Sequence, residues 1–517
     1  MYITNSWLWA LIGVSQLAIA TPARKAANWM EGMQRRQDNI ITSLGPQLSP
    51  GSELHRSDWA EWATETARWS TFSAPTFDLV FIPETENDIS LSYFTSHNIS
   101  FLAQGGGHGY SPTLGSIQNA VLVNLEKFNQ TTISDDGCLT IGGSARFSDI
   151  YAAAYSSGRE MTLGSCPCVG ATGATLGGGH GRLQGKHGLS ADALREVRLA
   201  LWNGTIIEAS TSQNADLFWG LRGAGQNFGV VIESTFETYP QANDGLHYNA
   251  DMVFTDDSLE DVLNAINKII PEQDPGLAMD LIFFADPSSL TAIAFLNLVY
   301  AGPQEQGEKF ADYFATTPAG QNSTSSARIN RLSNNVTLTP WDQLPYVSAG
   351  GAIAAACAKG LRQNTYTANL RQFDVNQTIE LYNSFGTFVK ANPAAAGSLI
   401  LYEVFGQEAV VSGPDTAAAN RQFGNVLALV EMAYADDAVA VIADDWAKGW
   451  RDVMVQPDIS GYPRAYVYQN YAHGDEPIGV YYGYEPERLE RLARLKSQYD
   501  PYGFFNGYHA IPTNGTS

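Results

Sequence analysis

Two short glycine-rich segments constrain this chain more than any other feature of its sequence. The first reads Gln-Gly-Gly-Gly-His-Gly-Tyr over residues 104–110 and follows an apolar run, 99–103, that is typical of a β-strand. The second reads Gly-Ser-Cys-Pro-Cys-Val-Gly over 164–170, and three more glycines follow at 177–179. A strand that ends in three glycines leaves backbone N–H groups with no Cβ beside them, which suits a turn that binds a phosphate or another anion.

The first segment does not fit the common phosphate-binding motifs. No Gly-Lys-Ser/Thr follows it, so it is not a Walker loop. The dinucleotide fingerprint Gly-x-Gly-x-x-Gly has to open a helix, whereas Ser111-Pro112 interrupts the chain directly after Tyr110. Spacing alone therefore predicts an anion-binding turn at the carboxyl end of a strand.

Taken together, the motifs resemble those of one known family. Gly-Gly-Gly-His-Gly-Tyr, then Cys-Pro-x-Val-Gly-x-x-Gly and Leu-Gly-Gly-Gly, are similar to the FAD-linked oxidases related to berberine bridge enzyme, within the vanillyl-alcohol oxidase/PCMH family. The resemblance extends from about residue 75 to 512 and is weak between about 244 and 460. It implies FAD as the cofactor, attached covalently at the two positions that match His108 and Cys166.

His108 and Cys166 carry this prediction. A neutral imidazole is a competent nucleophile toward the activated ring methyl of an oxidised flavin. A thiolate can add to the ring as well, and for this Cys166 needs a lowered pKa, which N–H donors of the glycine-rich backbone could provide. Cys168 is the alternative thiol, although the family's Cys-Pro-x-Val-Gly order starts at Cys166. Simpler interpretations are a hydrogen-bonded loop histidine and a small buried cysteine.

The resemblance also implies the other cofactor contacts. Val169 matches a position that controls oxygen access in the family, where valine goes with oxidases, so dioxygen is the expected electron acceptor. The segment 225–231 resembles the family's stretch near the adenine. Besides His108 and Cys166, the residues assigned to the cofactor are Gly105, Gly106, Gly107, Gly109, Val169, Gly170, Gly173, Gly177, Gly178, Gly179, Gly229, Val231 and Asn470.

The candidate base is Tyr471. Tyr-Gln-Asn-Tyr at 468–471 is similar to the family's Tyr-x-Asn-Tyr, whose second tyrosine deprotonates the substrate hydroxyl. A phenol has a pKa near 10, so it needs a cation or a hydrogen-bond donor beside it to act at neutral pH. The Arg-Asp that follows this motif in plant members is replaced here, and His473 or Asp475 could substitute. The other candidates are Tyr110 in catalysis and Tyr402, Glu403, Gln407 and Tyr468 in substrate binding; for Tyr402, Glu403 and Gln407 a packed sheet is the alternative.

We expect an α+β fold, with a two-subdomain FAD-binding domain of the PCMH type and a substrate domain whose antiparallel sheet is covered by helices. The alternation of strands 77–82 and 99–103 with a helix over 84–97 predicts a parallel unit. Asn-Gly at 203–204 predicts a hairpin. The expected segments are a signal peptide (1–20), an N-terminal helical segment (21–74) that includes Trp59, Trp62 and Trp69, the FAD-binding domain (75–243), the substrate domain (244–465) with a helix over 416–434, and a C-terminal segment (466–517) that returns to the FAD domain and the active site.

Composition and charge exclude some classes of partner. The formal net charge is −23, so a nucleic-acid partner is not expected.

Residues 7–20 form an apolar stretch too short to span a bilayer, which favours a secretory signal and a secreted protein with no membrane segment after its removal. Four cysteines are too few for a disulfide scaffold, and Cys166-x-Cys168 has no second pair at zinc spacing, so we expect no metal. The oligomeric state and the pairing of Cys138, Cys168 and Cys357 stay open.

Three functions are compatible with these features. The preferred one is an FAD oxidase that uses dioxygen to oxidise a hydroxyl-bearing small molecule of secondary metabolism and releases hydrogen peroxide. The segment Leu-Gln-Gly-Lys-His-Gly at 183–188 resembles the corresponding segment of biosynthetic relatives more than that of sugar oxidases. The second is a secreted oxidase of carbohydrates that forms a lactone. The third is a flavin-fold protein that binds a ligand or guides a cyclisation without redox turnover.

Overall fold

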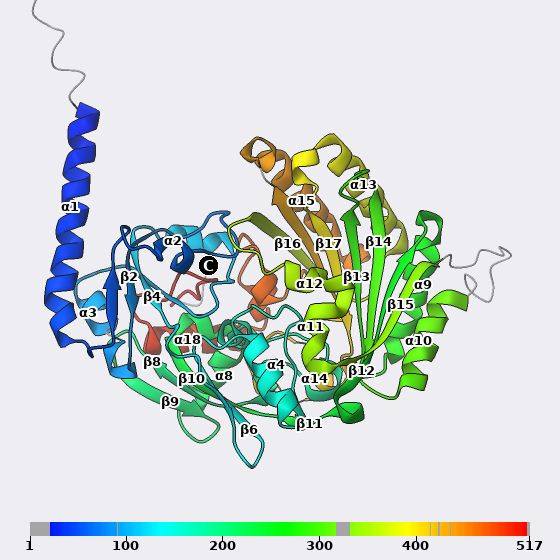
Figure 1. Ribbon diagram of the computed structural model, residues 1–517, viewed down its shortest axis with the longest axis horizontal. Coiled ribbons are helices and arrows are strands. Elements are labelled where there is room, and N and C mark those ends of the chain that lie inside the picture. The colour runs from blue at the N-terminus through cyan, green and yellow to red at the C-terminus, as the bar shows by residue number, and fades with distance from the viewer. Residues whose placement is uncertain are drawn as a thin grey trace, which may run out of the picture.

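The computed structural model describes residues 21–89, 91–316, 331–413, 415–421, 424–434 and 436–513. The predicted signal peptide, 1–20, lies outside the described residues. Two lobes face each other across the molecule, and helix α1 (Thr21–Leu44) projects from the first lobe (Figure 1). Among the described helices, none combines the length and the apolar character needed to cross a membrane.

The first lobe contains a small sheet with the order β1-β2-β4-β3. Its strands are β1 (Glu53–His55), β2 (Phe77–Ile82), β3 (Phe101–Gln104) and β4 (Ala120–Asn124). β4 is parallel to both β2 and β3, so the predicted parallel unit is confirmed. Helix α3 (Leu91–Ser96) is shorter than the predicted helix because a 3₁₀ turn capped by Thr85 precedes it. The first glycine-rich segment leaves the carboxyl end of β3.

A second, antiparallel sheet completes the first lobe, in the order β5-β6-β10-β8-β9. Its strands are β5 (Thr131–Ile133), β6 (Cys138–Gly142), β8 (Leu194–Ala200), β9 (Ile206–Ser210) and β10 (Val230–Glu237). β8 and β9 form the predicted hairpin, with Gly204 at a φ of +80° in its turn. Helices α4 (Phe147–Ser156), α5 (Ala171–Leu176) and α8 (Ala215–Ala224) pack against this sheet in one apolar core.

The three tryptophans of the N-terminal segment do not lie on one helix. Only Trp62 begins a short helix, α2 (Trp62–Glu65), and β1 joins the first sheet by pairing with β2. Trp69 instead stacks on His108, with 4.6 Å between the ring centroids. The three tryptophans span 11 residues, about three helical turns, whereas α2 has only four residues and cannot carry them all.

The second lobe is a seven-stranded antiparallel sheet in the order β15-β12-β14-β13-β17-β18-β16. Its strands are β12 (Leu246–Phe254), β13 (Leu277–Ala285), β14 (Ala292–Tyr300), β15 (Arg331–Pro340), β16 (Arg362–Leu370), β17 (Leu399–Phe405) and β18 (Val426–Tyr434). Helices α9 (Leu259–Ile269), α13 (Val375–Ala391) and α15 (Ala440–Met454) bury one face of this sheet, and α10 (Gln304–Thr316) lies beside them (Figure 1). The predicted sheet covered by helices is thus confirmed, and its other face turns toward the first lobe.

The predicted helix over 416–434 is wrong, because residues 426–434 form strand β18 between β17 and β16. Val426, Ala428 and Val430 point into the core under the helices, while Leu427 and Leu429 lie between them in the sequence and belong to the opposite face. The run is apolar on both faces, so neither the period of a helix nor that of a strand stands out in the sequence.

The C-terminal segment returns to the first lobe. Helix α18 (Pro486–Tyr499) packs its leucines into the core of the second sheet. The buried Lys496 ammonium pairs with Asp500 at 2.7 Å and donates to the carbonyl of Asn227 at 3.1 Å. A 3₁₀ turn over Gln469–Tyr471 precedes this helix and carries the candidate base.

Candidate active site

The two glycine-rich segments cross backbone to backbone. A Cβ on Gly106 would lie 2.5 Å from the backbone nitrogen of Gly170, and one on Gly170 would lie 2.7 Å from that of Gly106. A Cβ on Gly105 would lie 2.6 Å from the carbonyl oxygen of Gly143. Larger residues at these positions would push the segments apart, so the glycines bring together the residues that follow them.

This crossing places His108 beside Cys166. Ligand atoms of His108, Cys166 and Cys168 all lie within 4.8 Å of one another. The His108 Nε2 atom is buried and has no hydrogen-bond partner in the described part of the chain. Burial, helped by the nearby positive charge of Arg68, lowers the pKa of His108 to about 4. The imidazole is therefore neutral at physiological pH and keeps a nitrogen lone pair available, as a nucleophile requires.

Cys166 differs from the expectation for a reactive thiol. Burial raises its pKa to about 11, although a hydrogen bond from the backbone of Cys168 acts in the opposite direction. The glycine-rich backbone thus does not outweigh desolvation, and Cys166 is a thiol rather than a thiolate at neutral pH. Cys166 and Cys138 are the two free cysteines.

Cys168 forms a disulfide with Cys357, with 5.8 Å between their Cα atoms. The alternative assignment of Cys168 as the thiol that binds the cofactor is therefore wrong. The disulfide joins the second glycine-rich segment to the turn after helix α12 (Ala352–Ala355), and the Cys166 sulfur lies 3.7 Å from the Ile353 carbonyl of that helix. With Cys168 oxidised, His108 and Cys166 are too few to hold a structural zinc ion.

The third glycine run packs against the C-terminal segment. A Cβ on Gly177 would lie 1.9 Å from the Asn470 side-chain oxygen, and the Gly179 N–H donates to the Tyr468 hydroxyl at 3.1 Å. Asn470 donates to the same hydroxyl at 2.7 Å. Tyr468 is thus held in place by donors to its oxygen, and this run fixes the segment that carries Tyr471.

The other predicted cofactor positions differ in how much open space surrounds them. Gly173 is exposed and a Cβ there would meet no atom within 4 Å, while the buried oxygens of Thr172 and Gln226 nearby lack a partner among the described residues. Gly109 accepts a hydrogen bond from Arg68 at 2.9 Å. Gly107 and Gly178 have positive φ angles, +71° and +122°. A Cβ on Gly229 would lie 2.7 Å from the Ala200 carbonyl oxygen. Val169 and Val231 pack in the apolar core of the first lobe.

Tyr471 donates its hydroxyl hydrogen to Glu403 Oε1 at 3.2 Å. Its partner is thus a carboxylate and not the cation or hydrogen-bond donor expected from the sequence. Burial first, and the carboxylate of Asp280 second, raise the pKa of Glu403 to about 8. Burial and the Glu403 charge raise the pKa of Tyr471 well above its usual value. Glu403 is therefore the proton acceptor of this pair, and Tyr471 connects it to the cleft.

Arg182 is a residue that the sequence reasoning missed. Its guanidinium donates to Asp280 at 2.7 Å, to Asn297 at 2.7 Å and to Ser165 at 3.1 Å. Asp280 lies directly opposite Glu403 on the neighbouring strand. Arg182 thereby joins the residue before Cys166 to the carboxylate beside Glu403. In the sequence, its position directly after Gly-His-Gly at 179–181 is the feature that could have marked Arg182 as a site residue.

One predicted substrate contact, Tyr402, lies elsewhere, and another, Gln407, is held by hydrogen bonds to the backbone. Tyr402 points to the helix-covered side of the sheet and packs on Phe283 and Phe373, because neighbouring residues of a strand face opposite sides. Gln407 donates to the backbone carbonyls of Phe405 and Gly424 at 3.0 and 2.9 Å. In contrast, the Tyr110 hydroxyl is buried without a partner in the described residues, with its ring 5.2 Å from that of Trp69.

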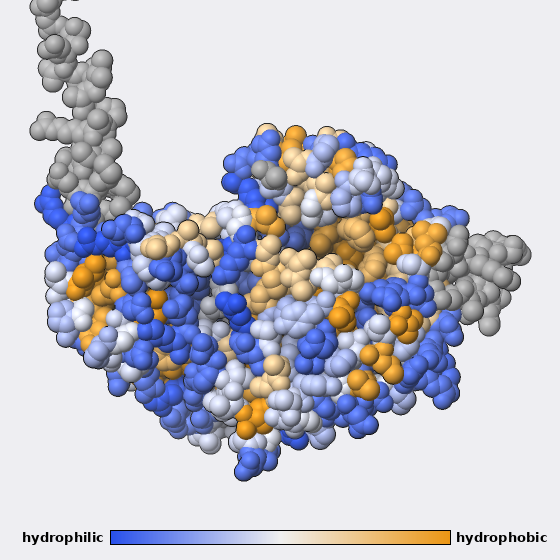
Figure 2. All heavy atoms as spheres, viewed as in Figure 1, coloured by the Kyte–Doolittle hydropathy of each residue, from blue (hydrophilic) through white to orange (hydrophobic). Residues whose placement is uncertain are grey.

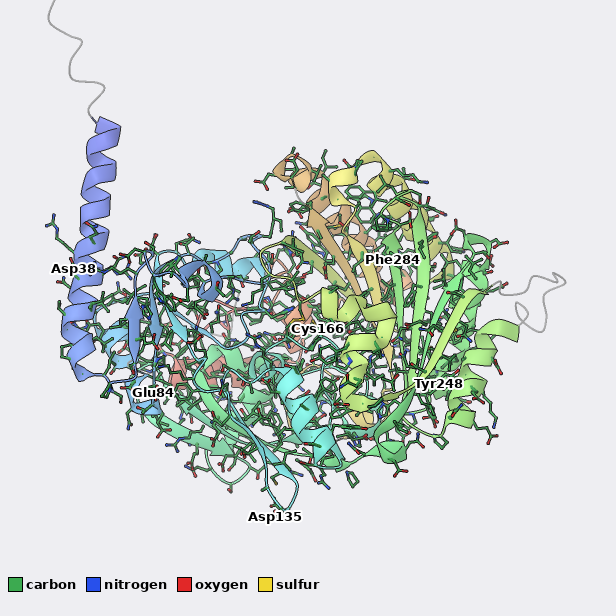
Figure 3. All side chains as sticks on the ribbon, in the orientation of Figure 1. Asp38, Glu84, Asp135, Cys166, Tyr248 and Phe284 are labelled. Carbon is green, nitrogen blue, oxygen red and sulfur yellow. A yellow bond between two sulfur atoms is a disulfide. The ribbon has the colours of Figure 1, made fainter. Side chains whose placement is uncertain are left out.

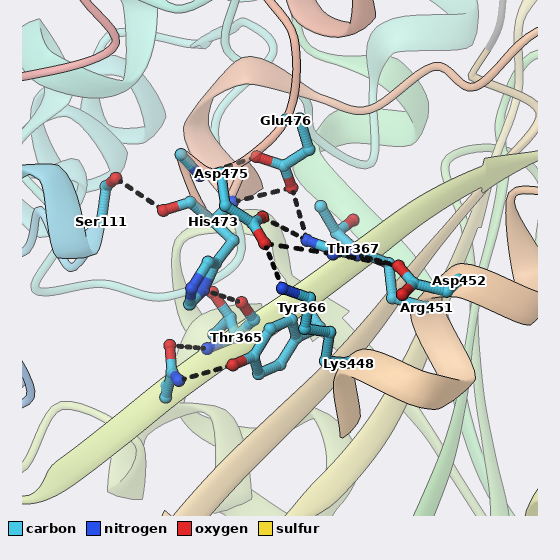
Figure 4. A network of polar contacts seen from close by, with 12 residues as sticks. Ser111, Thr365, Tyr366, Thr367, Lys448, Arg451, Asp452, His473, Asp475 and Glu476 are labelled. Atoms are coloured by element: carbon cyan, nitrogen blue, oxygen red, sulfur yellow. Dashed lines mark hydrogen bonds and ion pairs between the residues drawn. The ribbon is translucent and has the colours of Figure 1, made fainter. Parts of the chain in front are cut away.

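The segment that replaces the plant Arg-Asp anchors the active-site turn to the second lobe (Figure 4). His473 donates to or accepts from the Thr365 backbone oxygen at 3.0 Å, and its ring stacks on Tyr366 at 4.4 Å. Asp475 forms ion pairs with Arg451 and with Lys448, and the ion pairs outweigh burial and lower its pKa to about 2. Neither His473 nor Asp475 is hydrogen-bonded to Tyr471, so their role is structural.

Part of the open face of the second sheet is apolar. It carries six half-buried side chains on β13, β14 and β17: Ile282, Phe284, Ile293, Phe295, Leu399 and Leu401. We call this set the apolar wall. The surface is hollowed between the lobes, and apolar residues line the hollow (Figure 2). Cys166 lies on the side of the first lobe and Phe284 on the sheet opposite (Figure 3).

Comparison with known proteins agrees with this architecture. The family described as "FAD binding domain" matches residues 77–210, and the family "Berberine and berberine like" matches residues 467–512. The FAD-linked oxidoreductase srdI of Neurospora crassa is 31% identical over 99% of this chain and 100% of its own length. The FAD-linked oxidoreductase OXR1 of Pyricularia oryzae is 33% identical over 97% of each chain.

Solved structures share the fold at low sequence identity. The BBE-like 1 protein of Physcomitrella patens superposes with a TM-score of 0.75 at 20% identity, over 92% of this chain and 99% of its own. The glucooligosaccharide oxidase of Acremonium strictum, described with a 6-S-cysteinyl, 8α-N1-histidyl FAD, gives a TM-score of 0.75 at 19% identity over the same fractions. The fold and the site thus define an FAD-linked oxidoreductase. The chain belongs to the family of FAD oxidoreductases related to berberine bridge enzyme.

The residues present fit an FAD. The unpartnered buried atoms of His108, Thr172 and Gln226 lie along segments in which glycines allow a ligand to approach the backbone. A neutral histidine nitrogen and a thiol within 4.8 Å are a donor set that suits attachment to one ring system.

Proposed function

We propose that this protein is an oxygen-using FAD oxidase that oxidises the hydroxyl-bearing carbon of an apolar small molecule. One arrangement carries the proposal: the Tyr471–Glu403 pair and the His108–Cys166 pair lie on segments that meet between the two lobes, beside the apolar wall. The bound FAD would supply the hydride acceptor, and its reoxidation by dioxygen would yield hydrogen peroxide. The proposed acceptor rests on Val169, which matches the valine of the family's oxidases.

The protein's own residues would move the proton. The Tyr471 oxygen takes the proton of the donor hydroxyl as its own hydrogen passes to Glu403 Oε1, 3.2 Å away. The carboxylate has to be ionised to accept this hydrogen, and its pKa is about 8. The buried site excludes water around the pair, which keeps the transferred proton on Glu403 until the product leaves.

His108 and Cys166 would hold the cofactor covalently. The unpartnered Nε2 atom of His108 and the proximity of the Cys166 sulfur support this. Mass spectrometry of acid-precipitated protein tests the links. We expect the wild-type pellet and each of the His108→Ala and Cys166→Ala variants to keep flavin, whereas the double variant releases it. A wild-type pellet that loses its yellow colour on washing would contradict the proposal.

The apolar wall favours a hydrophobic donor of secondary metabolism over a carbohydrate. A sugar carries hydroxyls on every face, and burying them against isoleucine, phenylalanine and leucine side chains without hydrogen bonds costs about 1–3 kcal/mol each. The fungal relatives at 31 and 33% identity are named FAD-linked oxidoreductases, whereas the carbohydrate oxidase named above shares the fold at 19% identity.

We also propose that the protein enters the secretory pathway. Five of the seven Asn-x-Ser/Thr sequons lie within the described residues, and all five asparagines are exposed: Asn98, Asn129, Asn203, Asn335 and Asn376. Asn322 and Asn514 lie outside the described residues. Exposure is a requirement for glycosylation, and it supports a secreted glycoprotein.

A donor panel tests the redox function. Holoenzyme is mixed anaerobically with aromatic alcohols and, separately, with mono- and oligosaccharides, and the flavin absorbance is followed; peroxide is then measured in air. We expect bleaching and peroxide with the aromatic alcohols. Reaction with sugars alone would establish the carbohydrate alternative. Product formation without bleaching would establish a non-redox function.

A further inference from the structure

A second pocket lies where the first lobe meets the chain between β17 and β18. Its walls include residues of β8, α8 and α18 on one side, and of α14 (Glu408–Ser412) and residues 415–421, which we call the connector, on the other. The pocket has a volume of about 630 Å³, a size that accommodates a small organic molecule. None of the residues that line it is among those assigned to the cofactor or to the donor.

This pocket is basic, although the chain as a whole is acidic, with a formal charge of −23. The charged residues of its wall are four arginines and two aspartates: Arg195, Arg222, Arg421, Arg491, Asp192 and Asp415. The arginines come from separate elements that the fold brings together. Positive charge concentrated in one pocket of an acidic protein indicates a site for an anion.

Arg222 is the buried member of this cluster. It is 8% exposed, and its guanidinium donates to the backbone oxygens of Phe218 and Thr416 and to the Thr416 hydroxyl. Among the residues that the structure describes, no carboxylate forms an ion pair with Arg222. Burial lowers its pKa, and the charges of Arg421 and Arg491 act in the same direction, so both lie near it. A buried cation without a counter-ion is costly, and an anion from outside the chain would complement it.

Aromatic rings hold two of the guanidiniums in place. The guanidinium carbon of Arg222 lies 4.4 Å from the centre of the Phe218 ring, and that of Arg491 lies 3.9 Å from the centre of the Trp219 ring. Stacking of this kind fixes the plane of a guanidinium and leaves the N–H groups at its edge able to donate. The two groups are therefore oriented before a ligand arrives.

Arg421 adds a donor that has no partner. It belongs to the connector, is 6% exposed and pairs with Asp192. Its Nε atom is buried and makes no hydrogen bond within the described part of the chain. At the rim of the pocket, Arg491 pairs with the exposed Asp216. Exposed ion pairs contribute little to stability, so a ligand can compete for Arg491.

We propose that this pocket binds a phosphate monoester through Arg222, Arg421 and Arg491. These arginines reach it from α8, the connector and α18, so their donors come from several directions. A phosphate monoester carries nearly two negative charges near neutral pH and three terminal oxygens that point to different sides, whereas a carboxylate has one charge and two oxygens in a plane. The excess of two arginines over aspartates matches the dianion, and the rest of the volume would take the organic part of the ester.

A ligand in this pocket would connect the two lobes. Arg222 and Arg491 belong to the first lobe, whereas Arg421 lies on the connector that follows β17, the strand of Glu403. Binding should therefore stabilise the folded protein and leave the flavin site unoccupied by the ligand.

Two probes that share a ring and differ in their anionic group test this: phenyl phosphate and benzoate. Each is titrated by calorimetry into the FAD-loaded protein at pH 8, and the flavin absorbance and melting temperature are followed in parallel. We expect phenyl phosphate to bind with a Kd below about 100 μM. It should bind at least about tenfold more tightly than benzoate. It should also raise the melting temperature without changing the flavin absorbance.

Replacing the arginines should weaken this binding. Arg222→Gln and Arg491→Gln should each raise the Kd for phenyl phosphate at least about tenfold. Arg491 is part-exposed, so its variant provides the test if loss of the buried Arg222 prevents folding. Arg464→Gln is the matched control, because Arg464 also stacks on an aromatic ring, that of Tyr484 at 4.9 Å, and does not line the pocket. It should keep the wild-type affinity.

Absence of phenyl phosphate binding to the wild type would overturn the proposal, as would an affinity that survives Arg491→Gln or an equal affinity for benzoate. A titration that changes the flavin absorbance and does not depend on Arg491 would place the probe in the active site, and would overturn it too. The proposed oxidation is judged separately, by reduction of the flavin with a donor, so either function can fail without the other.

Discussion

Tyr471 and Glu403 share one hydrogen bond across the interface between the lobes, with the Tyr471 hydroxyl 3.2 Å from Glu403 Oε1. Tyr471 comes from the C-terminal segment and Glu403 from a central strand of the second lobe, 68 residues earlier in the chain. This hydrogen bond connects the Tyr471 phenol, which is a weak base by itself, to the Glu403 carboxyl group. The pKa of Glu403 is about 8, which lies near physiological pH.

Replacing either member of this pair should stop proton removal. We expect Tyr471→Phe and Glu403→Gln each to lower the rate of anaerobic flavin reduction by about 10²- to 10⁴-fold, since general base catalysis contributes a factor of that order. In the wild type the rate should rise as pH increases through about 8, because Glu403 has to lose its proton first. Stopped-flow absorbance across pH checks this. A pH profile that is the same in wild type and Glu403→Gln would contradict the assignment.

Arg182 and Asp280 should move that pH profile in opposite directions. Asp280 raises the pKa of Glu403 and Arg182 lowers it. Asp280→Asn should therefore shift the acidic limb of the rate profile to lower pH, and Arg182→Gln should shift it to higher pH. Arg182→Lys, which keeps the charge, is the control and should restore much of the wild-type profile. Shifts in the same direction would indicate a general loss of structure instead.

Arg182→Gln should also lower stability. It leaves the carboxylate of Asp280, which is 4% exposed, without its cation. Removing one partner of a buried ion pair costs about 3–5 kcal/mol. Denaturant unfolding of the holoenzyme, compared with Arg182→Lys, measures this cost. A loss below about 1 kcal/mol would show that water or another group replaces the guanidinium.

The Cys168–Cys357 disulfide should stabilise the interface between the lobes. It closes a loop with a sequence separation of 189 residues. We expect Cys357→Ser to lower the free energy of unfolding by about 2–5 kcal/mol, chiefly by restoring entropy to the unfolded chain. Thermal unfolding with and without reductant checks this, with Cys138→Ser as the control at a free cysteine. Flavin should stay attached in Cys357→Ser, because Cys166 is the residue proposed to carry it.

Glu160 should give the protein a pH-dependent stability. It is fully buried, and although burial acts to raise its pKa, the hydrogen bond with His187, the nearby His247 ring and the hydrogen bond from the Ala242 backbone lower it to about 2. A folded-state pKa below the unfolded value means that the stabilisation is present above about pH 4.5 and is lost as pH falls toward 2. Its size is about 3 kcal/mol from the difference in pKa. Glu160→Gln should flatten the dependence of unfolding free energy on pH in this range; an unchanged slope would contradict the assignment.

Local patterns determined much of the fold in advance. The parallel unit that includes β2, β3 and β4, the hairpin at Asn203-Gly204 and the sheet covered by helices all follow from alternation, turn residues and apolar periodicity. The resemblance to the family predicted that the two glycine-rich segments act together, through His108 and Cys166, and the structure brings Gly106 and Gly170 into contact. Strand β18 was missed because an apolar run buried on both faces has no clear period.

The sequence by itself determined the candidate groups of the site: a histidine and a cysteine framed by glycines, and a tyrosine in a Tyr-x-Asn-Tyr motif. Only the tertiary structure decided how those groups are poised. It paired Tyr471 with a carboxylate, raised the pKa of Cys166 and turned Tyr402 toward the helix-covered face of the second sheet. Ionisation and orientation depend on burial and on neighbours from distant strands, and these exist only once the chain has folded.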